Sequence, residues 1–340
     1  MTTERVNMDN AAVTLPDAPA IPGLTFRHFR GESDYPEILE MNTASKVADG
    51  LDHDIMTLEV LTQVYKNTVN HDPYKDVLIA EVDGKMVGFN RVFWAEEPDG
   101  TRVYSHVGFV PAEWRGKGLG RTMIHYAEQR AREMEAAREG KKGGMLDAWL
   151  NSDQSGLEAL LTSEGYKAVR YGYYMERDLE NIPEIPMPEG LEVRPAEPEH
   201  YRAIYDAATE AFRDHWGFTE PAEGEYEAWL QHPLYQPHLW QVAWDGDLVA
   251  GMVQNYIKED NNKLRGRKLG YTENISVRRP WRRRGLASAL IARSMKMHKE
   301  LGMTEVGLGV DSENPNGALQ LYEGLGYKVV MREMVYRKEL

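Results

Sequence analysis

Two short segments of this chain repeat one design, and the distance between them constrains the fold more than any other feature. Each segment begins at the end of a strand-like stretch and continues with a turn that contains arginine and glycine. A run in which apolar residues recur at helical spacing follows the turn. The segments read VPAEWRGKGLGRTMI from Val110 and VRRPWRRRGLASAL from Val277. Gly118 and Gly285 lie 167 residues apart, and other paired landmarks lie 161 and 162 residues apart. A period of this length is far too long for a solenoid repeat, so it predicts two duplicated domains.

The arginine–glycine turns predict a site for an anion. A helix that starts directly after such a turn has unpartnered backbone amides and a positive dipole end, and both favour phosphate. The dinucleotide-binding fingerprint is excluded because it would need glycine at Arg121, and no G-x-x-x-x-G-K-[ST] loop occurs. Both turns instead share the pattern R-x-x-G-x-[GA], which starts at Arg115 and at Arg282.

Composition narrows the possible functions. The 340 residues suit two domains of ordinary size, and the net charge of −14 argues against a general nucleic-acid-binding surface. The absence of cysteine excludes disulfides and a cysteine nucleophile, and the ten histidines show no metal-ligand spacing. No signal peptide or membrane-spanning run is recognisable. We therefore expect a cytoplasmic protein without a metal, a membrane anchor or a nucleic-acid partner.

The order of apolar patterns predicts the domain organisation. Residues 1–22 are polar and proline-containing and read as a flexible tail, and the proline-rich residues 181–190 read as a linker. The two domains are expected over residues 23–180 and 191–340. Each reads as strand, two helices, three strands, helix, strand, helix and two final strands. The predicted fold class is therefore α/β, or mixed α+β, with two tandem domains.

This element order and the two turns resemble the GNAT superfamily of acyl-CoA-dependent N-acyltransferases, over roughly residues 23–338. The segment SENPNGALQLYEGLGY, from Ser312 to Tyr327, is similar to the family motif N-x-x-(x)-A-x-x-L-Y-x-x-x-G-[FY]. Its spacing from Asn314 to Ala318 is one residue longer than the commonest form. The tandem plan is similar to that of mycothiol synthases, in which one copy is degenerate.

The resemblance implies that acetyl-CoA binds along a strand and at the following turn in each copy. In the second copy the implied contacts are Ile275, Val277, Arg282, Arg283, Arg284, Gly285, Leu286, Ala287, Ser288 and Asn314. In the first copy they are Val110, Arg115, Gly116, Lys117, Gly118, Leu119 and Gly120.

The resemblance also implies catalytic residues in the second copy. Tyr322 matches the tyrosine that protonates the departing thiolate, and Glu273 matches the strand glutamate that deprotonates the amine. Each has a plainer alternative: Tyr322 as a core aromatic and Glu273 as a solvated edge charge. In the first copy, Leu161 stands opposite Tyr322 and His106 stands opposite Glu273. We therefore predict that the first copy is degenerate, with His106 as either a base of its own or a structural residue.

The expected function is transfer of an acetyl group from acetyl-CoA to the primary amine of a small molecule, by direct attack. The segment AFRDHWGF, residues 211–218, and the acidic residues after it suit a cationic amine, or else form a buried helix end and a solvated acidic face. Two other functions stay open: acetylation of a protein N-terminus or lysine, and CoA binding without turnover. The shared tandem plan does not identify the acceptor.

Overall fold

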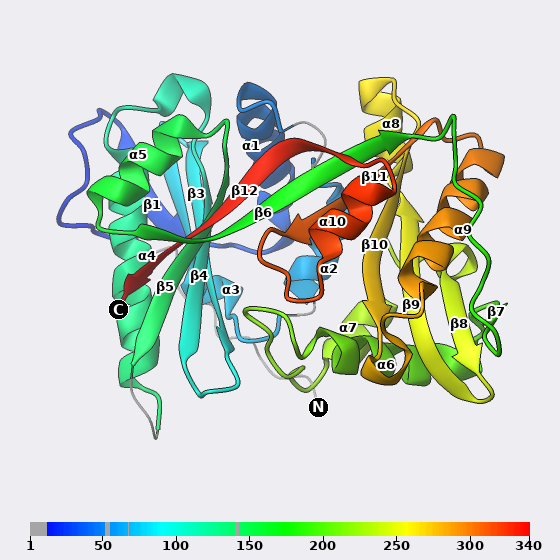
Figure 1. Ribbon diagram of the computed structural model, residues 1–340. Helices are drawn as coiled ribbons and strands as arrows, with labels where there is room; N and C mark the ends of the chain where they lie inside the picture. The colour runs from blue at the N-terminus through cyan, green and yellow to red at the C-terminus, as the bar shows by residue number, and fades with distance from the viewer. Residues whose placement is uncertain (1–11, 52–54, 67, 140–142) are drawn as a thin grey trace, which may run out of the picture.

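The computed structural model describes residues 12–51, 55–66, 68–139 and 143–340. In this part of the chain, twelve strands form one mixed sheet in the order β1-β2-β3-β4-β5-β12-β6-β11-β10-β9-β8-β7 (Figure 1). The strands are β1 (Leu24–His28), β2 (Val77–Val82), β3 (Lys85–Glu96), β4 (Arg102–Phe109), β5 (Gly144–Asn151), β6 (Lys167–Asp178), β7 (Glu192–Arg194), β8 (Gln241–Asp245), β9 (Leu248–Ile257), β10 (Leu269–Val277), β11 (Glu305–Asp311) and β12 (Lys328–Glu339). Both copies therefore contribute strands to one sheet, and the fold is of the α/β class.

The helices follow the predicted order in each copy. The first copy contains η1 (Glu32–Asp34), α1 (Tyr35–Ala48), α2 (Leu58–Lys66), α3 (Pro73–Asp76), η3 (Ala112–Trp114), α4 (Leu119–Ala136) and α5 (Ser155–Ser163). The second contains η4 (Pro198–His200), α6 (Tyr201–Phe212), α7 (Glu225–Leu230), η5 (Pro237–Leu239), α8 (Glu259–Arg265), η6 (Arg279–Trp281), α9 (Leu286–Glu300) and α10 (Ala318–Gly324). The short helices α3 and α8 were not predicted. Within the described ranges, no helix is long and apolar enough to span a membrane.

Alternation along the strands explains why helices cover both faces of the sheet. In β2, Val77 and Ile79 pack with α1 and α2, whereas Leu78 and Ala80 pack with α4. All four side chains are fully buried, because successive residues of a strand point to opposite faces. The second copy repeats this arrangement around β8, which has Val242 on the α6 side and Ala243 on the α9 side.

The last strand of each copy pairs with the other copy. β6 is antiparallel to β11 of the second copy, and β12 is antiparallel to β5 of the first. β6 and β12 also pair with each other, and Figure 1 shows them crossing between the two halves. We expected two final strands in each copy, but each ends in one strand of 12 residues that the two copies share.

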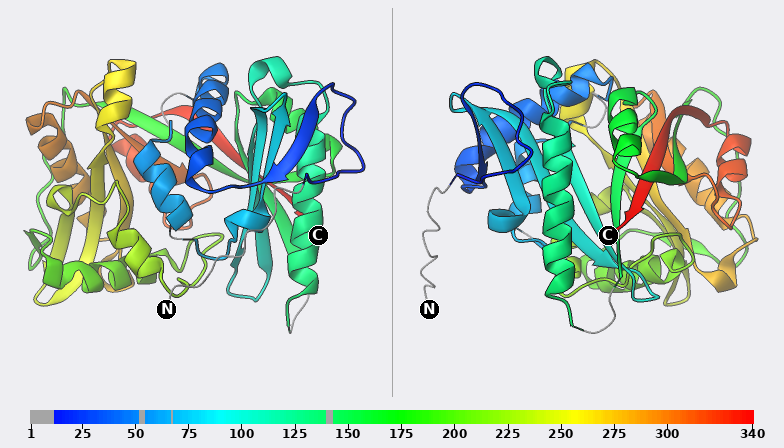
Figure 2. Two further views of the ribbon diagram at one scale, coloured as in Figure 1. Left: turned by 180° about the vertical axis from the view of Figure 1, so that it is seen from behind. Right: turned by 90° about the vertical axis from the view of Figure 1, so that its left-hand side faces the viewer.

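Part of the expected flexible tail is packed on the first copy. Val13, Leu15 and Ile21 contact the core formed by β1, β2 and α4, and the Val13 N–H donates to the Phe26 carbonyl at 2.7 Å. Figure 2 shows this segment looping beside β1 and α4. Its apolar side chains explain the docking, because burying each removes apolar surface from water. Residues 1–11 lie outside the described part of the chain.

Strand β12 of the second copy packs in the first copy, so a change in β12 is expected to affect the stability of the first copy. Met334 on β12 is 6% exposed and packs in the first-copy core with Leu146 and Leu150. We expect Met334→Ala to lower the free energy of unfolding by about 2–5 kcal/mol, the usual cost of a cavity in a core. Hydrogen exchange should speed up in β4 and β5 of the first copy. Val330→Ala, at an exposed position of the same strand, is the control and should change stability by less than about 0.5 kcal/mol. Faster exchange confined to β10 and β11 would contradict the prediction.

Candidate active site

A cleft opens where β10 separates from its parallel neighbour β11. The two strands pair only over Leu269–Tyr271 and Glu305–Gly307, although β10 continues to Val277. The pairing of β10 with β9 shifts between Glu273 and Ser276, which marks a bulge. Asn274 in this bulge has a φ of 47°, and its side-chain amide donates to Gln254 Oε1 at 2.9 Å. A bulge bends its strand, so β10 leaves β11 and exposes backbone inside the sheet.

The turn after β10 presents a helix N-terminus to this cleft. Arg283 has a φ of 63° and Gly285 a φ of 82°, and α9 begins directly after Gly285. Apart from the two chain neighbours of Gly285, no heavy atom of the described residues lies within 4 Å of where a side chain at this position would begin. The first amides of α9 therefore lie beside open space, which suits an anionic group.

Arg282 holds the turn in shape. Its guanidinium donates to the Val277 carbonyl at 2.9 Å, to Asp214 at 2.7 Å and to the Ala211 carbonyl at 3.2 Å. Hydrogen bonds from Arg279 and Arg282 hold the pKa of Asp214 well below its usual range. Arg282 thus connects the turn to the end of α6, and its charge is already paired with a carboxylate.

The predicted contacts of the second copy come together around a cavity of about 300 Å³. Predicted residues that line it are Ile275, Val277, Arg282, Arg283, Gly285, Leu286, Ala287, Ser288, Asn314 and Tyr322. Arg284 and Glu273 are not among the lining residues. The turn, the bulged strand and α10 therefore face one cleft.

Tyr322 on α10 lines the cleft and is buried. It is 6% exposed, and its ring packs edge-on against Tyr327 with centroids 6.1 Å apart. Burial raises the pKa of the Tyr322 hydroxyl, and the nearby charge of Glu273 raises it further. The hydroxyl is therefore protonated at neutral pH, which is the form that can donate a proton.

Glu273 lies on β10 immediately before the bulge and is half-buried. Its Oε1 accepts a hydrogen bond from the Gly309 N–H of β11 at 2.9 Å, across the gap between the strands. Burial raises the pKa of Glu273 to about 7, while the Gly309 hydrogen bond opposes the shift. A carboxylate with this pKa can exchange a proton near neutral pH.

The cavity is also lined by residues that were not among the predicted site residues, and Ser276 and His215 are two of them. Ser276 lines the cavity, and its hydroxyl is buried without a hydrogen-bond partner among the described residues. His215, from the segment after α6, also lines it and packs on Phe212 with ring centroids 4.5 Å apart. The AFRDHWGF segment indicated this region, but no sequence signal singled out Ser276.

The first copy has the same turn in a different setting. Arg115 donates to the Val110 carbonyl and to Ser45 Oγ, both at 2.9 Å, and therefore matches Arg282. Gly116 and Gly118 have φ values of 71° and 95°, Lys117 lies over the Trp114 ring, and Leu119 is buried in the core. The β3–β4 pairing runs without a shift from Phe89 to Glu96, so β4 has no counterpart of the β10 bulge.

Helix α5 also lies close against this first turn. A side chain at Gly120 would begin only 3.0 Å from Leu160 of α5, and Arg121 bonds Glu164 at 2.6 Å. The position of Tyr322 is held by the fully buried Leu161. His106 is buried and bonds the Tyr166 hydroxyl at 3.2 Å, and burial lowers the pKa of His106 to about 4. These contacts favour the structural interpretation of His106.

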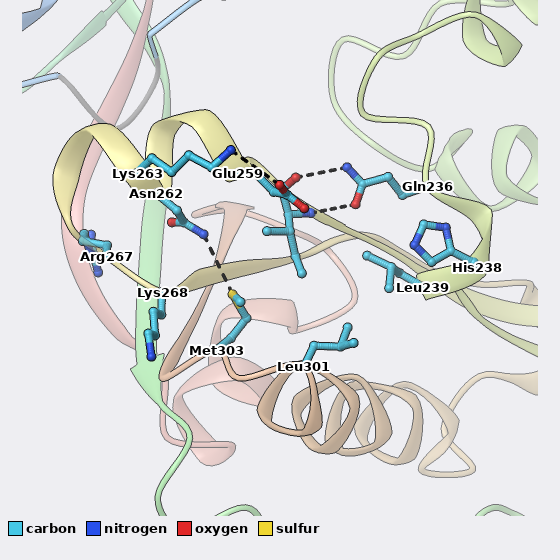
Figure 3. A pocket seen from close by; sticks show the side chains of 11 residues that line it. Gln236, His238, Leu239, Glu259, Asn262, Lys263, Arg267, Lys268, Leu301 and Met303 are labelled. Atoms are coloured by element: carbon cyan, nitrogen blue, oxygen red, sulfur yellow. Dashed lines mark hydrogen bonds and ion pairs between the residues drawn. The ribbon is translucent and has the colours of Figure 1, made fainter.

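A second cavity, of about 360 Å³, lies at the start of β10 in the second copy (Figure 3). Gln236 and Asn262 on its wall each exchange two hydrogen bonds with backbone, at Ile257 and Leu269. The rest of the wall combines apolar side chains with charged ones. The two amides therefore fix the backbone at the end of β9 and at the start of β10.

The cleft thus combines a strand splayed at a bulge with a turn that opens at the start of a helix. The chain belongs to the acetyltransferase (GNAT) family, whose model matches residues 41–139 and 201–327, one region in each copy. It is therefore an N-acetyltransferase with two tandem GNAT regions.

Two mycothiol acetyltransferases are similar to this chain over most of its length. Mycothiol acetyltransferase of Nocardiopsis dassonvillei is 26% identical over 293 residues, covering 76% of this chain and 80% of its own length. The enzyme of the same name from Thermobifida fusca is 26% identical over 261 residues, with coverage of 71% and 74%.

Two solved structures have a similar fold over nearly the whole chain. A GCN5-related N-acetyltransferase from Sphaerobacter thermophilus aligns with a TM-score of 0.70 and 26% identity, over 96% of this chain and 97% of its own. A tandem GNAT protein from the clavulanic acid biosynthesis pathway aligns with a TM-score of 0.67 at 16% identity, over 93% and 98%, and supports the fold alone.

Proposed function

We propose that this protein transfers an acetyl group from acetyl-CoA to the primary amine of a small molecule, and that the second copy carries the chemistry. The main support is that Tyr322 and the open turn at Gly285 line one cavity, while Glu273 bonds the Gly309 N–H where β10 has separated from β11. The names of the mycothiol acetyltransferase relatives favour a small acceptor over a protein.

The cleft residues suit the cosubstrate. Pyrophosphate would lie at the first amides of α9 with Arg283 close by, and the pantetheine arm would run along Ile275 and Val277. Arg282 would support the turn through Asp214. Asn314 lies on the opposite wall, where its side chain accepts from the Asn316 N–H at 2.9 Å.

The proposed reaction needs two proton movements. The amine nitrogen attacks the thioester carbonyl carbon, so a C–N bond forms and the C–S bond breaks. Glu273 takes a proton from the amine, directly or through one water molecule, and Tyr322 gives its proton to the departing thiolate. Both side chains begin in the required form, because Tyr322 is protonated and Glu273 titrates near neutrality.

The first copy is proposed to be structural. The first copy has Leu161, which carries no acidic group, in the place of Tyr322 and the buried His106, whose pKa is lowered, in the place of Glu273. Helix α5 also packs against Gly120 at the start of α4. The contribution of the first copy would be strand β6, which completes the sheet beside β11.

The proposal is tested by release of free thiol from acetyl-CoA with a panel of small amines and a panel of peptides. Faster release with small amines supports the assignment, and faster release with peptides would favour a protein acceptor. Tight CoA binding with no release on either panel would favour a binding protein without turnover.

The pKa of Glu273 predicts the pH dependence. A general base acts when ionised, so kcat/KM should fall about tenfold per pH unit below about 7. Glu273→Gln should lower kcat by about 100-fold or more and remove this acidic limb. A pH–rate series on both proteins checks it. Full activity of Glu273→Gln with an unchanged pH profile would show that another group is the base.

A further inference from the structure

The turn of the first copy is covered by a segment from the start of the chain. A side chain at Gly118 would begin 3.2 Å from Pro19 Cβ and 3.6 Å from Pro19 Cγ. Gly285 is the matching position of the second turn, since each glycine directly precedes its helix in the left-handed conformation. The space next to Gly285 is open, whereas Pro19 fills the space next to Gly118. The two turns therefore differ in access although their backbones are alike.

Polar contacts fix the covering segment to the first turns of α4. The Thr122 hydroxyl donates to the Asp17 carbonyl at 3.0 Å, and His125 Nδ1 lies 2.6 Å from Asp17 Oδ2. The other ring nitrogen of His125 lies 2.8 Å from Glu164 Oε2. Burial opposes a charge on His125, but the hydrogen bonds to Glu164 and Asp17 outweigh burial and raise its pKa. Protonated His125 thus bridges two carboxylates beside the turn.

Apolar and backbone contacts hold the same segment on both sides of Pro19. The Val13 N–H donates to a carbonyl of β1 at 2.7 Å, and the Ile21 N–H donates to the Pro19 carbonyl at 2.8 Å. Val13, Leu15 and Ile21 pack against the core that α4 shares with β1 and β2. We call residues 13–21 the N-terminal strap. Because the strap is anchored before and after Pro19, the proline ring is held over the turn.

Two arginines next to the first turn are paired within the first copy. Arg115 bonds Asp49, and Arg121 bonds Glu164 at 2.6 Å. Covering a charged group without a partner is costly, so these pairs allow a segment of the chain to lie close to the turn. The strap can therefore cover the turn without leaving either guanidinium group unpaired.

We propose that the N-terminal strap is an autoinhibitory contact that closes the first turn, so that CoA binds this chain at the second turn alone while the strap is seated. Phosphate at the first amides of α4 would need the space that Pro19 takes. The first turn keeps the shape of an anion site, because Gly116 and Gly118 have positive φ and Arg115 holds it as Arg282 holds the second turn. Displacing the strap is therefore expected to uncover a further CoA site, in the copy that takes no part in the proposed reaction.

The test measures CoA binding by calorimetry in the full chain carrying Gly285→Glu, which is expected to block the second turn. With the strap seated, we expect no measurable binding. Adding Asp17→Ala and Pro19→Gly removes the contact with His125 and the ring over Gly118. The apparent affinity for CoA should then rise about tenfold or more, because it is proportional to the fraction of molecules whose site is open.

Pro16→Gly is the matched control. Pro16 is an exposed proline of the same strap, and its replacement adds the same backbone freedom as Pro19→Gly. In the Gly285→Glu chain this control should leave CoA unbound. A melting temperature close to that of the parent chain shows that each variant is folded.

Hydrogen exchange at the Val13 amide reports whether the strap has moved, since this N–H is bonded to β1 in the seated strap. Faster exchange together with new CoA binding supports the inference. Faster exchange without CoA binding overturns it, and so does equal CoA binding with the strap seated and displaced. If exchange is unchanged, Leu15→Asp replaces the two substitutions, because a carboxylate in the apolar contact displaces the strap, and the same outcomes decide. Failure of wild type to bind CoA would overturn the proposed function and leave this comparison valid.

Discussion

Gly285→Glu is expected to abolish acetyl transfer, while Gly118→Glu leaves kcat within a few-fold of wild type. Gly285 opens onto empty space at the first turn of α9, where the pyrophosphate would lie. A carboxylate there meets phosphate at short range in a partly desolvated turn, and like charges repel by several kcal/mol. The turn at Gly118 belongs to the copy that we propose to be structural.

Gly285→Gln is the matched control, because it adds the same bulk and the same backbone strain at a φ of 82° without the charge. It should keep more activity than Gly285→Glu. Steady-state kinetics and calorimetry with CoA on all three variants measure the effect. An inactive Gly118→Glu together with an active Gly285→Glu, both folded, would place the chemistry in the first copy.

Tyr322→Phe is expected to lower kcat by about 100-fold or more, the usual contribution of a general acid. The substitution removes only the hydroxyl, so the ring packing against Tyr327 should remain. Stopped-flow release of free thiol gives the rate of the step that needs the proton.

The control for this substitution is Tyr327→Phe, a buried tyrosine five residues away. Its hydroxyl bonds Thr272 Oγ1 at 2.7 Å, so its loss should reduce stability by about 1 kcal/mol and change kcat only slightly. Equal losses of kcat in the two variants would mean that Tyr322 acts through packing.

Local patterns predicted the elements well because each depends on nearby residues. The Asp83–Gly84 turn is an example: both residues have positive φ, as a tight hairpin requires, and β2 and β3 join there. The two turns were recognisable because arginine and glycine stand at fixed spacing before an amphipathic helix.

Partners distant in sequence were not predictable. Arg282 was interpreted as a phosphate ligand, but its guanidinium bonds Asp214, which only the fold brings near. The bulge at Asn274 contains no glycine, and the stretch ENISV reads as an ordinary strand. The sequence also gave no indication that β6 and β12 pair with strands of the other copy. The alternation of residues in a strand predicts which face of the strand is buried, but not which strand lies beside it.

The exchange of the last strands has a consequence for how the chain folds during synthesis. Glu333 pairs with Asn151, which the ribosome makes 182 residues earlier. One edge of β5 therefore stays unpaired until the end of the chain has been synthesised. An unpaired strand edge can pair with other chains. A first half produced alone would keep this open edge and would tend to aggregate. Each copy made separately would therefore lack a strand partner that the other supplies, β12 beside β5 in the first copy and β6 beside β11 in the second.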